Sequence, residues 1–303
     1  MNRTLRRIAA CALLALLPTA LTFAGERHFE KKFSAASGGT LTVATDVGSL
    51  TVTGSSDNEV AVLADLRGRQ KEVDDFDISV SQTEKGVDVK GRGRQSRWFS
   101  WGSNDLEVHF TIRVPHEYNL RLNTSGGEIQ ISSLKGSAQG ETSGGDIHLA
   151  DFEGEVSLNT SGGSIKAENV KAKTHMETSG GDITVTSAMG SVDVSTSGGN
   201  IRISDVDGNV RAETSGGNIT VRLKNGNKGV YAETSGGNVD IVMGKTLAAN
   251  IDASTSGGEV VCDLPVTVSG KIDESRIKGV INGGGNTIYA HTSGGNVRIR
   301  ALE

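Results

Sequence analysis

The motif TSGG occurs nine times in this 303-residue chain, and the spacing of its copies is nearly constant. Five consecutive gaps are 18 residues long, and the later gaps are 20, 21 and 37 residues. The copies begin at Thr124, Thr142, Thr160, Thr178, Thr196, Thr214, Thr234, Thr255 and Thr292. A fixed period in this range is typical of architectures in which each repeat packs only against its neighbours. The repeat therefore limits the fold to a tandem array.

Apolar and polar residues alternate on both sides of each motif. In one unit Val192 and Val194 precede Thr196, and Ile201 and Ile203 follow it, with polar residues between them. A period of two with many β-branched residues predicts two short strands per unit, each with one buried face. Like residues at a constant period favour stacked coils over a row of separate hairpins. We therefore predict an all-β fold, a single-stranded parallel β-helix or β-solenoid with 18-residue coils, right-handed as parallel crossovers usually are.

The SGG letters are predicted to form the corners of the coils. The chain must reverse within three residues there, while neighbouring coils pass about 4.8 Å away. Glycine suits such a corner because it tolerates positive φ and carries no Cβ toward the next coil, and Thr and Ser hydroxyls can pair with turn amides. The predicted corner glycines are Gly126, Gly127, Gly144, Gly145, Gly162, Gly163, Gly180, Gly181, Gly198, Gly199, Gly216 and Gly217.

Both ends of the chain depart from the period. Residues 25–115 are predicted to form an N-terminal β region with degenerate coils, including an inserted hairpin in FDISVSQTEKGVDVKG and a strand in LEVHFTIRVP. Residues 116–303 are predicted to form the TSGG-repeat solenoid, with a degenerate corner at Gly283 to Gly285. The strand at 297–301 is predicted to be the last of the rod, which leaves that end bare or covered by a partner and makes end-to-end self-association possible.

Residues 1–24 have the order of a secretory signal peptide. Arg3, Arg6 and Arg7 precede an apolar run, and small residues lead up to Ala24, after which we expect cleavage. The run is short for a membrane span. Cys11 lies before the apolar core rather than after it, which argues against a lipidated cysteine. We expect an exported protein, periplasmic or at the cell surface or secreted, with no transmembrane segment in the mature chain.

Composition narrows the function classes. Without residues 1–24 the chain holds 28 basic and 36 acidic residues, and this mild acidity argues against a nucleic-acid partner. Cys262 is then the only cysteine, so no internal disulfide can form. With 41 glycines and 4% aromatic residues, the core is expected to be thin.

A column of mostly polar residues follows the SGG letters. We interpret it as side chains that pair with turn backbones, with a short asparagine ladder at Asn200, Asn218 and Asn238. The alternative is a calcium column like that of GGxGxD nonapeptide repeats, but no GxD follows here. We therefore predict no metal and no cofactor. The outer column of the following strand is heterogeneous, which argues against a repetitive ligand.

The segment GRGRQSRWFSWG is the best local candidate for ligand contact. It holds Arg92, Arg94, Arg97, Trp98, Phe99 and Trp101, and it contains both tryptophans of the chain. Arginine beside exposed aromatic side chains suits stacking on sugars or bases, or a position at a membrane interface. A loop that caps the end of the solenoid is the alternative.

Catalytic signatures are weak, and no catalytic residue is predicted. The six histidines show no metal-ligand spacing such as HExxH, and no GxSxG is present. Cys262 falls on the predicted inward side, which suits an inert thiol. Polysaccharide lyases built on β-helices are the competing class, but short uniform corners leave little wall for a cleft.

The layout resembles a family of exported bacterial proteins described as putative adhesins of unknown function. The resemblance rests on LTVATDVGSLTVTG, on VHFTIRVPHEYNLRLNTSGGEIQISSLKG at 108–136, and on the TSGG series that continues toward the C-terminus. It covers nearly all of the mature chain. It implies a parallel β-helix in the cell envelope and supplies no catalytic residues.

Together these features predict an exported, non-enzymatic β-solenoid that acts as an adhesin-like or scaffold protein of the envelope. The expected partner is an envelope glycan or an envelope protein. One alternative is a carbohydrate-active β-helix enzyme. A second alternative is an envelope sensor or regulator subunit whose bare C-terminal coil docks a membrane partner.

Overall fold

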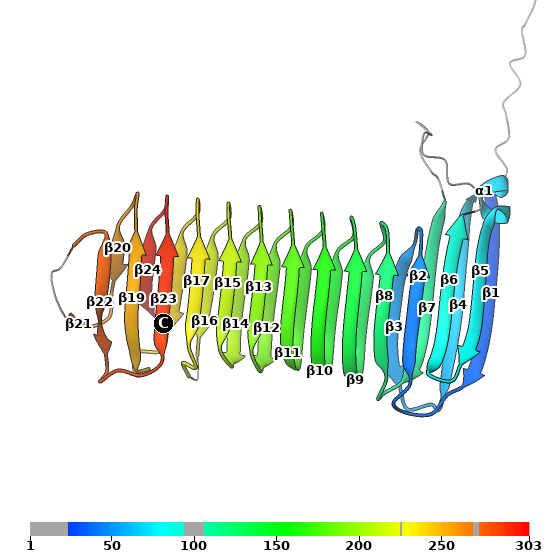
Figure 1. The fold of residues 1–303 in the computed structure, drawn as a ribbon, viewed down its shortest axis with the longest axis horizontal. Helices are drawn as coiled ribbons and strands as arrows, with labels where there is room; N and C mark the ends of the chain where they lie inside the picture. Colours follow the sequence, from blue (N-terminus) through cyan, green and yellow to red (C-terminus); the bar gives the residue numbers. More distant parts are fainter. Residues whose placement is uncertain (1–23, 94–105, 225, 269–272, 303) are drawn as a thin grey trace, which may run out of the picture.

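The computed structural model describes residues 24–93, 106–224, 226–268 and 273–302, and this part of the chain forms a rod of stacked coils (Figure 1). Its 24 strands form one continuous, mostly parallel hydrogen-bonded sheet that coils along the rod. The predicted β-solenoid is confirmed.

The part of the chain that the structure describes contains 24 strands. The first twelve are β1 Ala24–Ser34, β2 Thr40–Thr45, β3 Ser49–Ser55, β4 Glu59–Arg69, β5 Phe76–Thr83, β6 Gly86–Gly93, β7 Glu107–Pro115, β8 Asn119–Thr124, β9 Ile129–Thr142, β10 Ile147–Thr160, β11 Ile165–Thr178 and β12 Ile183–Met189. The others are β13 Val192–Thr196, β14 Ile201–Asp207, β15 Val210–Thr214, β16 Ile219–Leu223, β17 Val230–Thr234, β18 Val239–Met243, β19 Ala249–Thr255, β20 Val260–Cys262, β21 Thr267–Val268, β22 Arg276–Ile281, β23 Thr287–Thr292 and β24 Val297–Ala301. A five-residue helix, α1 Gln70–Asp74, lies between β4 and β5.

The strands form two layers. Layer 1 contains the strands that follow the TSGG turns, together with four N-terminal strands, in the order β1, β4, β7, β3, β9, β10, β11, β12, β14, β16, β18, β24, β20. Layer 2 contains the strands that precede the turns, together with strands at both ends of the rod, in the order β5, β6, β2, β8, β9, β10, β11, β13, β15, β17, β23, β19, β22, β21. Strands β9, β10 and β11 are long enough to bend through both layers.

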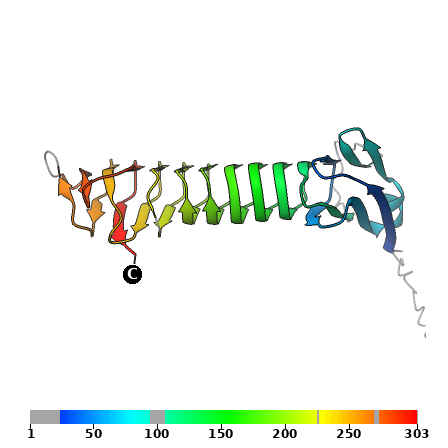
Figure 2. The same cartoon turned by 90° about the horizontal axis from the view of Figure 1, so that it is seen from below.

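The coil winds right-handed. In Figure 1 the near strands of layer 2 run upward, the chain crosses over at the top, and successive coils move from right to left. Figure 2, seen from below, shows the chain crossing between the layers at the opposite edge.

Like residues stack on like residues along the rod. Ile147 pairs with Ile165 and Leu158 with Met176, each 18 residues further on. Within one coil Ile147, Leu149, Phe152 and Leu158 point inward and are at most 2% exposed. The alternation in the sequence therefore identified the core side of each strand, and burial of these side chains holds the layers together.

The two edges of the rod are built differently. Opposite the TSGG turns, a short polar residue adopts a left-handed conformation in several coils, with φ of 58° at Ser133, 52° at Asp151 and 54° at Asn169. Asn and Asp tolerate this conformation better than other residues with a Cβ, which explains the links such as ADFEG and SDVDG between strands.

Two reasons for glycine in the TSGG turns were predicted, a close approach of the next coil and a positive φ, and only the first applies. A Cβ on Gly145 would lie 2.1 Å from the carbonyl oxygen of Gly127, and a Cβ on Gly163 would lie 2.0 Å from that of Gly145. The predicted close approach is confirmed for the second glycine of each turn. The predicted positive φ is wrong, because none of the twelve corner glycines lies in that region. The first glycine of the turn has more room: Gly144 has no atom within 4 Å of a built Cβ, while a Cβ on Gly257, near the C-terminal end, would lie 3.1 Å from the carbonyl oxygen of Ser293.

The C-terminal coil lies out of sequence order. Strand β23 is inserted between β17 and β19, and β24 lies between β18 and β20. The prediction that residues 297–301 end the rod bare is therefore wrong: β22 runs antiparallel along β19 beyond them, and β21 pairs with β22. The chain does turn at the predicted degenerate corner, Gly283 to Gly285, with φ of 84° at Gly283. This turn joins β22 to β23 within layer 2, however, and does not lead from one layer to the other as the TSGG turns do.

The N-terminal end is closed by antiparallel strands as well. The first coil, β2 and β3, lies between the β6–β7 coil and the β8–β9 coil. Strand β4 pairs antiparallel with β7 and with β1, and β5 with β6, so the predicted hairpin and strand are confirmed. Phe76 and Phe110 are fully buried at this end.

Candidate functional site

The buried threonines of the TSGG motifs form a structural column. The hydroxyl of Thr160 donates to the carbonyl oxygen of Gly145 in the preceding coil at 2.9 Å and accepts the amide of Gly163 in its own turn at 3.3 Å. The same pair of contacts recurs at Thr142 and Thr178. These peptide groups lie where the strand ladder is interrupted, so the hydroxyls replace the missing backbone bonds. The motif is thus explained by stability alone.

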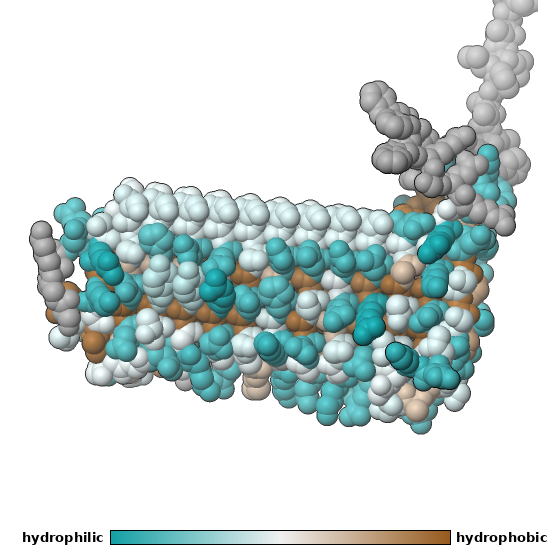
Figure 3. Space-filling view, viewed as in Figure 1, coloured by the Kyte–Doolittle hydropathy of each residue, from teal (hydrophilic) through white to brown (hydrophobic). Residues whose placement is uncertain are grey.

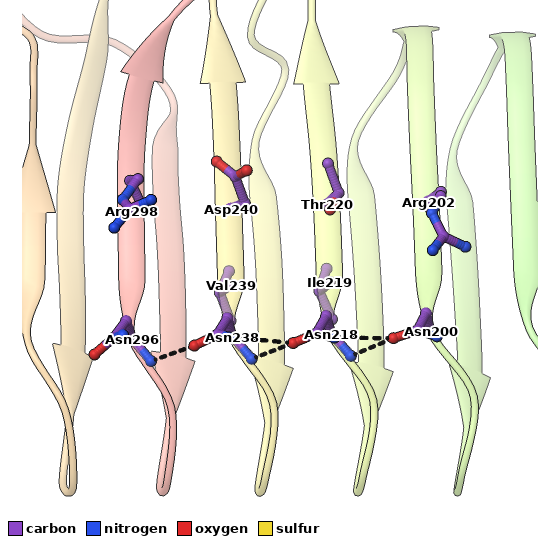
Figure 4. A pocket seen from close by; sticks show the side chains of 10 residues that line it. All are labelled: Asn200, Arg202, Asn218, Ile219, Thr220, Asn238, Val239, Asp240, Asn296 and Arg298. Carbon is purple, nitrogen blue, oxygen red and sulfur yellow. Dashed lines mark hydrogen bonds between the residues drawn. The ribbon is translucent and has the colours of Figure 1, made fainter.

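The column after the turns is a second ladder, and the interpretation from sequence is confirmed. The amide oxygen of Asn200 accepts both the backbone N–H of Asn218, at 2.9 Å, and its side-chain N–H, at 3.1 Å. Asn218 does the same for Asn238, and Asn238 accepts the backbone N–H of Asn296 (Figure 4). The ladder continues to Glu259, whose N–H donates to Asn296 at 2.9 Å.

The same kind of contact occurs earlier in this column, where Ser164 donates its N–H to Asp146 and Asp182 donates its N–H to Ser164, and Asp182 then accepts as a carboxylate. Its Oδ1 accepts the backbone N–H of Asn200 at 2.7 Å, and this hydrogen bond holds the pKa of Asp182 below its usual value of 3.8. The Arg202 guanidinium, 3.3 Å away, acts in the same direction. A hydrogen bond to the charged form of a carboxyl group favours that form.

We expect Asp182→Asn to change the acid dependence of stability. A carboxyl with a depressed pKa stabilises the fold above the unfolded value near 3.8 and loses that contribution as pH falls through the folded value. The wild-type chain should therefore exceed the variant in unfolding free energy by more at pH 7 than at pH 3. Urea unfolding at both pH values measures this, and an equal difference at the two would contradict it.

A shallow depression lies on the outer surface of layer 1, over strands β14, β16, β18 and β24. It encloses about 390 Å³, and its lining includes Arg202, Thr220, Asp240 and Arg298, one from each strand (Figure 4). The asparagine ladder borders it on the side of the turns. The small Thr220 side chain leaves a hollow between the longer neighbours. The arrangement offers amide and guanidinium donors on an open surface, which suits binding rather than a closed reaction chamber.

A smaller depression of about 140 Å³ lies nearer the N-terminus on the same surface. Its lining includes Thr51, Gln130, His148, Lys166 and Glu168. Lys166 pairs with Glu168 at 3.0 Å, so its charges are matched locally.

Two tyrosines form a stacked pair on the outer surface of layer 2, which the sequence had not indicated. The rings of Tyr231 and Tyr289 lie 4.7 Å apart with 10° between their planes, and the Arg211 guanidinium lies 4.5 Å from the centre of the Tyr231 ring on its neighbouring strand. The Tyr231 hydroxyl bonds to Glu233, which raises the pKa of Tyr231 to about 12. Stacking of this kind fastens the inserted strand β23 to β17.

The ridge of turns itself carries only small side chains. Figure 3 shows the serines and glycines of the turns as a pale row along the upper edge of the rod, above more hydrophilic side chains. No side chain there is large enough to build a pocket wall.

The structure describes only part of the Arg and Trp segment that was predicted from the sequence to contact a ligand. Arg92 lies at the end of β6 and is exposed. Arg94, Arg97, Trp98, Phe99 and Trp101 lie outside the described residues, so ligand contact there stays a prediction. Cys262 is half-buried, and burial raises the pKa of its thiol.

Within residues 24–93, 106–224, 226–268 and 273–302 no cluster of His, Cys, Asp or Glu is arranged to hold a metal ion. No helix in these ranges is long and apolar enough to cross a membrane.

A parallel β-solenoid with polar outer surfaces and short corners is a repeat protein of the solenoid class. The chain belongs to the Toastrack DUF4097 family, whose model matches residues 39–300. The resemblance noted from the motifs is thereby confirmed. No curated protein sequence matches the chain.

Several solved structures are similar to this chain at low sequence identity. A putative adhesin from Parabacteroides distasonis has a TM-score of 0.51 and 13% identity over 91% of this chain and 97% of that one. A putative adhesin from Parabacteroides merdae has a TM-score of 0.49 and 12% identity over 91% of this chain and 97% of that one. A structure from P. distasonis described as a putative lipid binding protein has a TM-score of 0.45 and 13% identity over the same shares. At this identity the first likeness establishes only the fold.

Proposed function

We propose that this chain is an exported, non-enzymatic β-solenoid that acts as an adhesin-like or scaffold protein of a bacterial envelope. It displays side chains on two long, flat surfaces that are held rigid by the ladders inside the rod. The observation that carries the proposal is the depression on layer 1, an open and shallow surface rich in hydrogen-bond donors. A rigid array of such side chains supports multivalent binding, because several weak contacts act together.

The secretory order of residues 1–24 and the adhesins among the similar structures support the envelope location. The competing enzyme hypothesis gains no specific support from the described surfaces. The sensor hypothesis assumed a bare C-terminal coil, and that coil lies inside the stack with β22 and β21 beyond it.

Expression of the full chain in a bacterium, beside a matched chain that lacks residues 1–24, tests the proposal. We expect the full chain to lose its leader and to co-sediment with envelope fragments, while the shortened chain stays in the cytoplasm. Purified protein mixed with envelope fragments should bind them and leave the length of their polysaccharides unchanged. Chain shortening, or a full chain that neither leaves the cytoplasm nor binds the fragments, would overturn the proposal.

A further inference from the structure

Four arginines gather on the outer surface of layer 1 near the C-terminal end of the rod. Arg202 on β14 and Arg298 on β24 flank Thr220 and Asp240 in one row across the strands. In the next row, two residues further along each strand, the order is Ser204, Arg222, Val242, Arg300. All four arginines are exposed. We call Arg202, Arg222, Arg298 and Arg300 the arginine face.

Positive charge is in excess on the arginine face. Arg202 pairs with Asp182 at 3.3 Å, and Arg300 pairs with Asp240 through two hydrogen bonds. Neither Arg222 nor Arg298 forms an ion pair with any residue that the structure describes. The chain as a whole has a net charge of −5, so this local excess opposes the overall charge. The overall charge of the protein would therefore repel an anionic ligand. An anion that binds at the arginine face must be held by local contacts with these arginines.

The arginine face is bordered, on the side of the TSGG turns, by uncharged side chains on the coils of β14, β16, β18 and β24. The ladder column consists of amides at Asn200, Asn218, Asn238 and Asn296, whereas the flanking coils carry Asp182 on one side and Glu259 on the other. Each side-chain amide nitrogen carries two donors, and Asn218 and Asn238 each use one within the ladder. The remaining donors border the 390 Å³ depression over Thr220.

These features fit an extended polyanion that also carries hydroxyl groups. The depression spans four strands, or about 14 Å along the rod at ~4.8 Å per strand. Guanidinium groups bind carboxylates through paired hydrogen bonds, and amide donors suit sugar hydroxyls. A membrane fits less well, because Met189 is the one large apolar side chain that is exposed among the described residues. An adjacent aromatic platform for nucleic-acid bases is missing from the lining of the depression.

We propose that the arginine face binds a linear acidic polysaccharide, with Arg222 and Arg298 contacting its carboxylate groups and the asparagine ladder its hydroxyls. This inference rests on the proposed function and gives its ligand class. Asp240 holds Arg300 in place and leaves Arg298 beside it free to contact the polymer. The polysaccharide runs along the rod, across the strands.

The test uses the full chain and measures binding to polygalacturonate by titration calorimetry at low and at physiological salt. We expect binding that weakens with salt, and at least a tenfold loss of affinity in the double variant Arg222→Gln/Arg298→Gln. The matched control is Arg113→Gln/Arg121→Gln, which removes two exposed arginines far from the arginine face and should stay within twofold of wild type. Far-UV circular dichroism checks that both variants are folded.

Three outcomes would overturn the inference. These are absence of polygalacturonate binding by the wild-type chain, equal binding of neutral dextran, and equal loss in the two double variants. Binding to vesicles with anionic headgroups, and binding to inorganic phosphate, are measured in two separate experiments. Binding to vesicles that depends on Arg222 and Arg298, without binding to polygalacturonate, would also overturn it in favour of a lipid headgroup. Retained binding to envelope fragments in any of these cases would leave the proposed function standing.

Discussion

Gly145→Ala should destabilise the rod by about 3 kcal/mol, at the upper end of the usual cost of overpacking. The new Cβ would lie 2.1 Å from the carbonyl oxygen of Gly127 and 2.7 Å from the amide nitrogen of Glu128. Both are backbone atoms of the preceding coil, so no side chain can rotate away to make room. Urea unfolding followed by far-UV circular dichroism measures the loss.

Gly144→Ala is the matched control, one residue earlier in the same turn. No atom lies within 4 Å of its added Cβ, and its φ is not in the left-handed region. Its unfolding free energy should stay within about 0.5 kcal/mol of wild type, as is usual for surface substitutions. Equal stability of the two variants would mean that the coils do not approach each other as closely as the structure has them.

The contrast within each turn shows how far the motif could be interpreted from sequence. The letters TSGG indicated a tight corner, and the threonine and the second glycine have the roles that stacking requires. The sequence could not separate close approach from positive φ, because glycine satisfies both. Positive φ occurs instead at the opposite edge, at residues such as Ser133 and Asp151.

The order of the coils could not be predicted from the repeat. From β8 to β18 each coil lies beside the one before it in sequence, with β17 and β18 next to β15 and β16. The β2–β3 coil, by contrast, already lies between the later β6–β7 and β8–β9 coils. The last coil, β23 and β24, enters between two earlier ones, and β23 pairs with β17 on one side and with β19 on the other. A constant period fixes which residues face inward, but it contains no information about which coil lies beside which.

The two surface features of the C-terminal third follow from that insertion. Tyr231 and Tyr289 each stand three residues before the threonine of a TSGG motif, so the alignment places them in one column. They become neighbours only because β23 pairs with β17. Arg298 similarly completes the arginine face because β24 lies beside β18. Alignment of the TSGG motifs therefore predicts which residues share a column on the surface. It does not predict that Tyr231 and Tyr289, or the arginines of the arginine face, become neighbours.

The proposed division between residues 25–115 and 116–303 stays a prediction. The β2–β3 coil pairs directly with β8 and β9, which places hydrogen bonds across this position. The Arg and Trp segment at 92–101 likewise stays a prediction as a ligand contact.

The central claim is that the coils stack in parallel register, with the final coil inserted out of order. Two cysteine pairs in a chain with Cys11→Ser and Cys262→Ser test it most directly. Glu233→Cys with His291→Cys joins register neighbours, about 4.8 Å apart. Glu233→Cys with Ser254→Cys joins coils that are consecutive in sequence and two steps apart in the stack, about 9.6 Å.

A disulfide requires a Cα separation of about 4.4–6.8 Å, and separations above about 7 Å exclude it without backbone movement. After mild oxidation we expect nearly complete disulfide formation in the 233/291 pair and two free thiols in the 233/254 pair, measured by thiol titration and peptide mass spectrometry. A disulfide at 233/254 with free thiols at 233/291 would mean that the coils stack in sequence order, and free thiols in both would contradict parallel stacking in register.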